Sequence, residues 1–249
     1  MNRSVVVTGG SKGIGWEIVK VFAQNGYKVV SGSRTLKNDI PYDLQDKIQQ
    51  VIIDVRIKDN HLKLIDKAMN FGGSLDCYIN NAGFSEWRPI SLIDQDFLKE
   101  IFETNLFGYF WGCQAAAKVL KPGGSILNIS SLAGKRGSTN NSAYSATKFG
   151  VTGLTQSLCK ELGPIGIRVN SVCPVLIETP GLKKALKSKE SPATLSESDF
   201  LNNFAIHQTA LGRLPTITEV AELCFFLCSE KASGITGQSI NIDCGVLPN

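Results

Sequence analysis

Short apolar runs rich in valine and isoleucine alternate along the chain with longer stretches in which apolar residues recur at helical spacing. The short runs show little polar alternation, so each predicts a strand that is buried on both faces. Strands are expected at residues 4–8, 28–33, 49–55, 75–80, 125–130, 167–173 and 238–243. Helices are expected at residues 13–25, 60–71, 94–120, 143–162 and 217–228, with two short polar helices before the last of these.

This alternation is typical of an α/β fold in which helices cover both faces of a doubly wound parallel sheet. Right-handed connections place the carboxyl ends of all the strands at one edge, and ligands bind there where the strand order reverses. No linker or shift in composition divides the chain, so residues 1–249 are predicted to form a single domain.

Composition and charge argue against several classes of function. Apolar residues make up 43% of the chain, and the net charge of +4 comes from interspersed signs. The densest basic cluster is better explained as the solvated face of a short helix than as a nucleic-acid stripe; its members are Lys183, Lys184, Lys187 and Lys189. No apolar run approaches the ~20 residues that cross a bilayer. Neither a nucleic acid nor a membrane is therefore an expected partner.

The seven cysteines are scattered and odd in number, and no signal segment opens the sequence. Reduced thiols in a cytoplasmic protein are the simplest interpretation. With only two histidines and no cluster of cysteine and histidine, we expect no metal site, and a zinc-dependent alcohol dehydrogenase is disfavoured.

A glycine-rich segment follows the first predicted strand directly. Its glycines allow the backbone to approach a pyrophosphate, and the helix that begins near Gly13 directs free N–H groups and its positive dipole end at that anion. The spacing differs from the common Gly-x-Gly-x-x-Gly fingerprint, and such a turn by itself also occurs for structural reasons. Its place between strand and helix favours dinucleotide binding. The expected contacts are Gly9, Ser11, Lys12, Gly13, Ile14 and Gly15.

The end of the second strand indicates which dinucleotide binds. A carboxylate there would bond the ribose hydroxyls of NAD, but the chain has Ser33 and Arg34. A guanidinium binds phosphate through a planar fork, and Lys12 adds a second cation. The alternative is that both are ordinary surface cations. We predict that NADP(H) is preferred over NAD(H), with Ser33 and Arg34 as cofactor contacts.

Tyr144 is the only tyrosine with a lysine four residues later, Lys148. On a helix this spacing puts both side chains on one face, where the ammonium is expected to lower the pKa of the phenol and to let it exchange a proton near neutral pH. The spacing alone is a common coincidence. Ser131 at the end of the fifth strand can place a hydroxyl beside the same substrate oxygen.

Other unusual residues fall at the same predicted edge. Asn81, Ala82 and Gly83 end the fourth strand, and Pro174 ends the sixth. Asn105 lies inside the long helix, where a polar role facing the site or a solvated position would each explain it. The convergence of four strand ends on one edge is more specific than any single motif.

Together these motifs resemble the short-chain dehydrogenase/reductase family along essentially the whole chain, and in particular its members that act on 3-oxoacyl thioesters. The resemblance implies a Rossmann-like sheet of seven strands with three helices on each side. It implies a catalytic tetrad of Asn105, Ser131, Tyr144 and Lys148. It also implies that Asp54 and Val55 cradle adenine, and that Ile177 and Thr179 contact the nicotinamide carboxamide.

Carried over, the resemblance implies that NADPH delivers a hydride to a carbonyl carbon while Ser131 binds the carbonyl oxygen and Tyr144 protonates it. Lys148 would lower the pKa of Tyr144 and hold the nicotinamide ribose, and Asn105 would position a water linking Lys148 to solvent. Two positions depart from the family pattern. Val175 follows Pro174 where glycine is usual, which predicts crowding of the nicotinamide or a changed backbone, and Cys244 also replaces a usual glycine.

The substrate is expected to be a small molecule with a carbonyl or alcohol group, possible identities being a 3-oxoacyl thioester or another ketone. Residues 180–205 form the expected variable substrate loop. Two alternatives stay open, an NAD-linked dehydrogenase of a secondary alcohol or sugar, and an NADP-binding sensor without turnover. The resemblance further implies a homotetramer, or a homodimer, assembled through the helix at 143–162 and the last strand.

Overall fold

The computed structural model describes residues 3–193 and 196–248, and a parallel sheet with the strand order β3-β2-β1-β4-β5-β6-β7 lies at its centre. The seven strands are β1 (Ser4–Thr8), β2 (Lys28–Ser33), β3 (Ile48–Ile52), β4 (Cys77–Asn80), β5 (Ser125–Ile129), β6 (Arg168–Pro174) and β7 (Ser239–Ile242). Every neighbouring pair is parallel, which confirms the predicted doubly wound α/β sheet.

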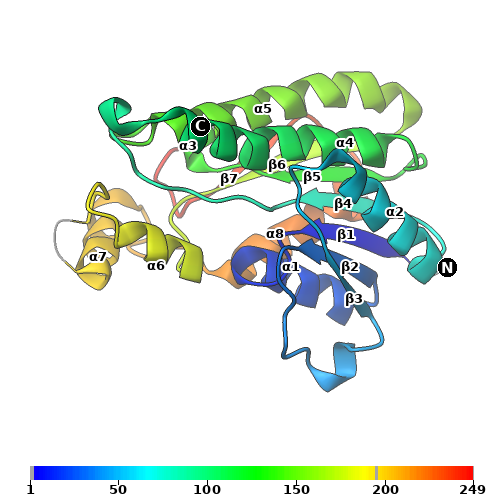
Figure 1. Cartoon of the computed structure of the whole chain (residues 1–249). Coiled ribbons are helices and arrows are strands. Elements are labelled where there is room, and N and C mark those ends of the chain that lie inside the picture. Colours follow the sequence, from blue (N-terminus) through cyan, green and yellow to red (C-terminus); the bar gives the residue numbers. More distant parts are fainter. Residues whose placement is uncertain (1–2, 194–195, 249) are drawn as a thin grey trace.

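Helices cover both faces of the sheet (Figure 1). The helices are α1 (Gly13–Gln24), α2 (Lys58–Gly72), α3 (Gln95–Phe102), α4 (Gly108–Ala117), α5 (Ser142–Leu162), α6 (Pro180–Leu186), α7 (Glu197–Gln208) and α8 (Ile217–Cys228). Consecutive residues of β1 face opposite sides of the sheet. Val5 and Val7 pack with α1 and α8, and Val6 packs with α2, α4 and α5. This two-sided burial explains why the strands lack polar alternation.

The expectation of three helices on each face is wrong for one of the faces. In the part of the chain that the structure describes, α2, α4 and α5 cover one side, and α1 and α8 cover the other (Figure 1). Residues 34–47 connect β2 to β3 through the short 3-10 turn Tyr42–Leu44 instead of a helix. Pro41 precedes that turn, and Leu44 is the buried residue of the turn. The connection has too few apolar residues to form the apolar stripe with which a helix packs on a sheet.

Two predicted elements differ from the structure by more than two residues at a boundary. The third strand was expected to reach Val55 but ends at Ile52, because Asp54 begins a turn in which its carbonyl accepts from the N–H of Ile57 at 3.1 Å. The helix expected over residues 94–120 is interrupted by the π-helical segment Glu103–Phe107, and its last part, α4, ends at Ala117. Single π turns of this kind are frequently found at functional sites.

Helices α6 and α7 lie beside the sheet instead of over either face (Figure 1). They have a small core of their own, made by Trp87, Ala185, Leu186 and Leu201. The two short helices predicted before the helix at 217–228 are thus confirmed, and residues 194 and 195 between them lie outside the described part of the chain. No helix in the described residues is long and apolar enough to cross a membrane.

Candidate functional site

The strand order reverses between β1 and β4, and the loops that follow these two strands are bonded to each other. The Thr8 hydroxyl accepts from the N–H groups of Asn81 at 3.0 Å and Ala82 at 3.1 Å. The Asn81 side chain donates to the carbonyl of Thr8 at 2.9 Å. The predicted segments at residues 8–15 and 81–83 therefore form one continuous surface at the carboxyl edge of the sheet, which is where a parallel sheet binds ligands.

The glycine turn needs glycine for reasons visible in its geometry. Gly9 and Gly13 have positive φ values of 69° and 56°, which side chains disfavour. A Cβ on Gly9 would lie 2.8 Å from the Cα of Ala82, and a Cβ on Gly15 would lie 2.3 Å from the carbonyl oxygen of Gly9. Helix α1 begins here with no capping side chain and no acidic residue in its first turn, so its end is suited to an anion.

The end of β2 lies beside the same turn. Ser11 of the glycine turn and Thr35 have their hydroxyl oxygens 3.4 Å apart, and the Ser33 hydroxyl donates to the carbonyl of Thr35 at 2.7 Å. Arg34 between them is exposed, as is Lys12. The charge of Arg34 also reaches Asp54, whose pKa is lowered mainly by Arg56 and to a smaller extent by Arg34. The predicted positions Ser11, Ser33, Arg34 and Asp54 thus come together.

The segment after β6 closes the other side of the turn. A Cβ on Gly13 would meet the side chain of Thr179 at 3.5 Å, and the Thr179 hydroxyl caps α6 by accepting from the N–H of Leu182 at 3.1 Å. Ile177 is buried. Val175 is not among the described residues with a positive φ, and its N–H donates to the carbonyl of Ile242 at 3.3 Å. Cys244, by contrast, adopts a φ of 53°, the left-handed conformation that favours glycine.

The predicted pair on α5 lies beside Ser131, as expected. Ser131 directly follows Ser130 after β5, and its hydroxyl accepts from the N–H of Ala133 at 3.1 Å. Tyr144 is half-buried, and a side-chain hydrogen bond with Ser131 lowers its pKa. A serine hydroxyl and a tyrosine hydroxyl that meet in this way present two donors to one acceptor, such as a carbonyl oxygen.

The predicted effect of Lys148 on Tyr144 is wrong. Desolvation by burial outweighs the Ser131 contact and raises the pKa of Tyr144 above its ordinary value. The ammonium of Lys148 lies 5.7 Å from the centre of the Tyr144 ring and donates instead to the carbonyl of Ile129, at 2.8 Å. Burial lowers the pKa of Lys148 itself to about 7, so it carries only part of a positive charge at neutral pH.

Tyr109 is a residue of this site that the sequence reading missed. Its buried hydroxyl accepts from Lys148 at 3.3 Å and donates to the carbonyl of Ile129 at 2.9 Å, so the two side chains share one acceptor. The available signal was its spacing: Tyr109 follows Asn105 by four residues, as Lys148 follows Tyr144. A neighbouring thiol, Cys173 at the end of β6, also lies within electrostatic reach of Lys148 and Tyr144.

Asn105 is buried, which decides against the solvated position. Its side-chain oxygen accepts from the N–H of Phe84 at 3.0 Å, and its side-chain nitrogen donates to the carbonyl of Phe84 at 2.7 Å. A Cβ on Gly83 would lie 3.0 Å from the same oxygen. The π-helical segment therefore turns Asn105 onto the loop that follows β4, and the amide fixes that loop through its backbone.

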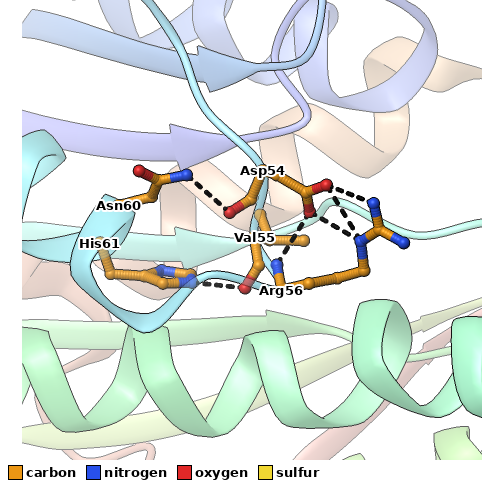
Figure 2. A network of polar contacts seen from close by, with 5 residues as sticks. All are labelled: Asp54, Val55, Arg56, Asn60 and His61. Carbon is orange, nitrogen blue, oxygen red and sulfur yellow. Dashed lines mark hydrogen bonds and ion pairs between the residues drawn. The ribbon is translucent and has the colours of Figure 1, made fainter.

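Asp54 and Val55 lie in the loop between β3 and α2, held by their neighbours (Figure 2). The guanidinium of Arg56 donates to both carboxylate oxygens of Asp54, at 3.0 Å from Nε and 2.6 Å from Nη2. The side chain of Asn60 donates to the carbonyl of Asp54 at 3.0 Å. A carboxylate with fixed orientation is a suitable acceptor for the exocyclic amine of adenine.

Comparison with known proteins agrees with this site. The family model described as enoyl-(acyl carrier protein) reductase matches residues 9–247. The chain belongs to the short-chain dehydrogenase/reductase family. It is therefore an oxidoreductase that acts on CH–OH and C=O groups.

Three relatives show the range of the family around this chain. The 3-oxoacyl-[acyl-carrier-protein] reductase of Chlamydia muridarum is 32% identical, over 99% of this chain and 98% of that protein. The aldohexose dehydrogenase of Thermoplasma acidophilum has a TM-score of 0.89 and 31% identity, and the match covers 98% of this chain and 94% of that one. A variant of actinorhodin polyketide ketoreductase with NADPH has a TM-score of 0.88 and 28% identity, over 98% and 97% of the two chains.

Proposed function

We propose that this oxidoreductase uses NADP(H) to reduce a ketone to a secondary alcohol. The observation that carries the proposal is the contact between the hydroxyls of Ser131 and Tyr144, at the same edge of the sheet as the glycine turn. The expected preference for NADP(H) supports reduction as the working direction, in which Tyr144 gives its proton to the developing alkoxide.

The chain has a suitable place for the cofactor. Its pyrophosphate would face the uncapped start of α1 and the turn at Gly9, Gly13 and Gly15, where added Cβ atoms would meet neighbouring atoms or sit on a left-handed backbone. Thr179 and Ile177 would border the nicotinamide end, with Pro174, while Ala82, Asn81 and Gly83 would line the floor. When bound, the reduced nicotinamide supplies the hydride.

Each residue of the tetrad then has one task. Ser131 orients the substrate oxygen by donating a hydrogen bond, and Tyr144 donates the proton. Lys148, tethered to Ile129 and Tyr109, stands behind Tyr144 with a pKa of about 7, so that it can exchange a proton with its surroundings near neutrality. Asn105 keeps Phe84 and its loop in place; the proposal that it also holds a relay water rests on family resemblance alone.

The preference for NADP(H) rests on Arg34 and Lys12. Both are exposed cations. Lys12 follows Ser11 in the glycine turn, Arg34 precedes Thr35 after β2, and the hydroxyls of Ser11 and Thr35 join the two segments. Ser33 adds a third hydroxyl at this place. The carboxylate that would favour NAD is absent from the end of β2, and Asp54, whose pKa is influenced by Arg34, is engaged by Arg56. The relative that was solved with NADPH supports the same choice.

Replacement of Arg34 tests the cofactor assignment. Wild-type protein is expected to oxidise NADPH with a kcat/KM at least tenfold above that for NADH, using a panel of ketones, aldehydes and 3-oxoacyl thioesters. Arg34→Ala should remove most of this preference, since a charge-assisted bond to phosphate contributes about 1.5–3 kcal/mol. Arg136 is an exposed arginine on the expected substrate side. Arg136→Ala should change kcat/KM for NADPH and for NADH by the same factor. Preference for NADH in the wild type would contradict the assignment.

The same panel separates the possible substrates. A 3-oxoacyl thioester is favoured by the resemblance to the Chlamydia muridarum reductase, and Lys135, whose charge reaches Cys173 in the site, could attract an anionic arm. An NAD-linked dehydrogenase of a sugar or secondary alcohol is the second candidate, supported by the likeness to an aldohexose dehydrogenase. A sensor without turnover is disfavoured because a sensor needs no paired Ser131 and Tyr144.

We also propose a homotetramer, or at least a homodimer, in the cytoplasm. Three aromatic side chains of neighbouring helical segments are each 45–47% exposed: Phe107 at the end of the π-helical segment, Phe110 on α4 and Phe149 on α5. Apolar side chains exposed in this way would gain from burial by a second copy. Sedimentation velocity at micromolar concentration should find no more than a trace of monomer, and a purely monomeric boundary would contradict the assembly. The seven cysteines are free thiols, in keeping with a reducing compartment.

A further inference from the structure

Helix α2 carries a histidine in the middle of its apolar stripe. The buried residues of this helix include His61, Leu64, Ile65 and Ala68, a spacing at which one side of a helix faces the core. The His61 side chain is fully buried, and both ring nitrogens are engaged. Nε2 lies 2.8 Å from the carbonyl oxygen of Val55, and Nδ1 lies 2.8 Å from the hydroxyl of Tyr78 (Figure 2 shows the first contact).

The partners settle the tautomer of this histidine. A carbonyl oxygen only accepts, so Nε2 carries the proton and donates to Val55. Burial lowers the pKa of His61 and raises that of Tyr78, so both side chains are neutral at physiological pH. Tyr78 then donates to the bare Nδ1. The result is a directed chain that runs from β4 through the imidazole to the backbone at Val55.

Val55 is also confined from the opposite side, by helix α4. A Cβ on Gly108 would lie 3.1 Å from the Val55 carbonyl oxygen and 3.2 Å from its Cβ. The peptide between Val55 and Arg56 is therefore held between the imidazole and the first residue of α4. A shift of this peptide would carry Asp54 with it, because the Asp54 carboxylate is bonded to the N–H and guanidinium of Arg56.

We propose that His61 is a positioning residue for the adenine half of the dinucleotide: it fixes the backbone of Asp54 and Val55 from the inside of the protein, with Tyr78 orienting its ring. The inference rests on the proposed function and on the adenine contacts that the family resemblance implies for Asp54 and Val55. A leucine at position 61 would fill the same apolar stripe and would need no hydrogen-bond partner of its own. It would leave the Val55 carbonyl buried without the hydrogen bond that His61 donates.

The test measures binding of adenosine bisphosphate, the half of NADP that lacks the nicotinamide, by calorimetry, and kinetics with NADPH. H61L should weaken both the bisphosphate and NADPH about tenfold, as loss of an outer-shell partner does elsewhere. The KM for NADPH should rise while kcat at saturation stays within about twofold. H61Q, whose amide nitrogen can reach the Val55 carbonyl, should restore binding to within about threefold of wild type.

Two further variants separate positioning from stability. I65V shortens a buried neighbour on the same helix and should lower the midpoint of urea unfolding without changing either affinity. Y78F keeps the ring and the fold but removes the donor to Nδ1, and it should weaken bisphosphate binding in the same direction as H61L. That variant decides the case if H61L does not fold.

Unchanged bisphosphate affinity in H61L or Y78F would overturn the proposal. Equal weakening in I65V and H61L would do the same, because it would assign the effect to stability. A wild-type protein that binds neither the bisphosphate nor NADPH would overturn the proposed function itself, whereas normal binding by wild type and by every variant would remove only the role of His61.

Discussion

Replacement of Tyr144 by phenylalanine is expected to lower kcat for ketone reduction by about 10³-fold or more, with NADPH affinity within about threefold of wild type. General acid catalysis by a positioned side chain contributes about 10²–10⁴-fold, and phenylalanine keeps the ring but has no proton to give. Stopped-flow or steady-state oxidation of NADPH measures the rate, and fluorescence titration measures the affinity.

The matched control for this variant is Tyr42→Phe, which removes a hydroxyl from a side chain that is 90% exposed. Its kcat and affinity should equal those of the wild type. Retention of more than a tenth of the wild-type kcat in Tyr144→Phe would show that another group supplies the proton. Tyr109 would then be the first residue to examine, because its hydroxyl also contacts Lys148.

The second large effect is expected from Gly15→Ala, which should weaken binding of NADPH and NADH alike by about 30-fold or more. The added Cβ would lie 2.3 Å from both the Gly9 carbonyl oxygen and the Asn81 side-chain nitrogen, so the turn and the loop after β4 must both move. The N–H groups at the start of α1 would then no longer face the pyrophosphate as a set. Overpacking of this kind also costs about 1–3 kcal/mol of stability.

Gly234→Ala is the control for this prediction. Gly234 does not have a positive φ, and a Cβ there would meet nothing within 4 Å, so the change should be neutral or slightly stabilising. Calorimetric affinities and urea unfolding of the two variants give the comparison. If Gly15→Ala bound both cofactors with wild-type affinity, the result would show that the pyrophosphate does not bind at the glycine turn.

Most of the fold was predictable because its strands and helices follow from local apolar spacing. Strands β1 and β2 and helix α8 have the predicted bounds, and each is a continuous apolar or amphipathic run with a clear end. The differences arise where long-range contacts overrule local pattern. The run of apolar residues through Val55 looks like strand, but Arg56 and Asn60 turn the chain at Asp54. Residues 94–120 look like one helix, but Asn105 and Gly108 must meet Phe84 and Val55.

The site divides in the same way. The spacing of Tyr144 and Lys148 on one helix, the order of small residues in the glycine turn and the basic end of β2 are properties of the sequence, because neighbours three or four positions apart on a helix meet whatever surrounds them. Burial is a property of the folded chain, and it decided the protonation chemistry. It raised the pKa of Tyr144, lowered that of Lys148 to about 7, and directed the ammonium to Ile129 and Tyr109. Sequence thus determined which side chains share one face of α5, and tertiary structure decided their contacts and the direction of their pKa shifts, because desolvation depends on every element packed around the site.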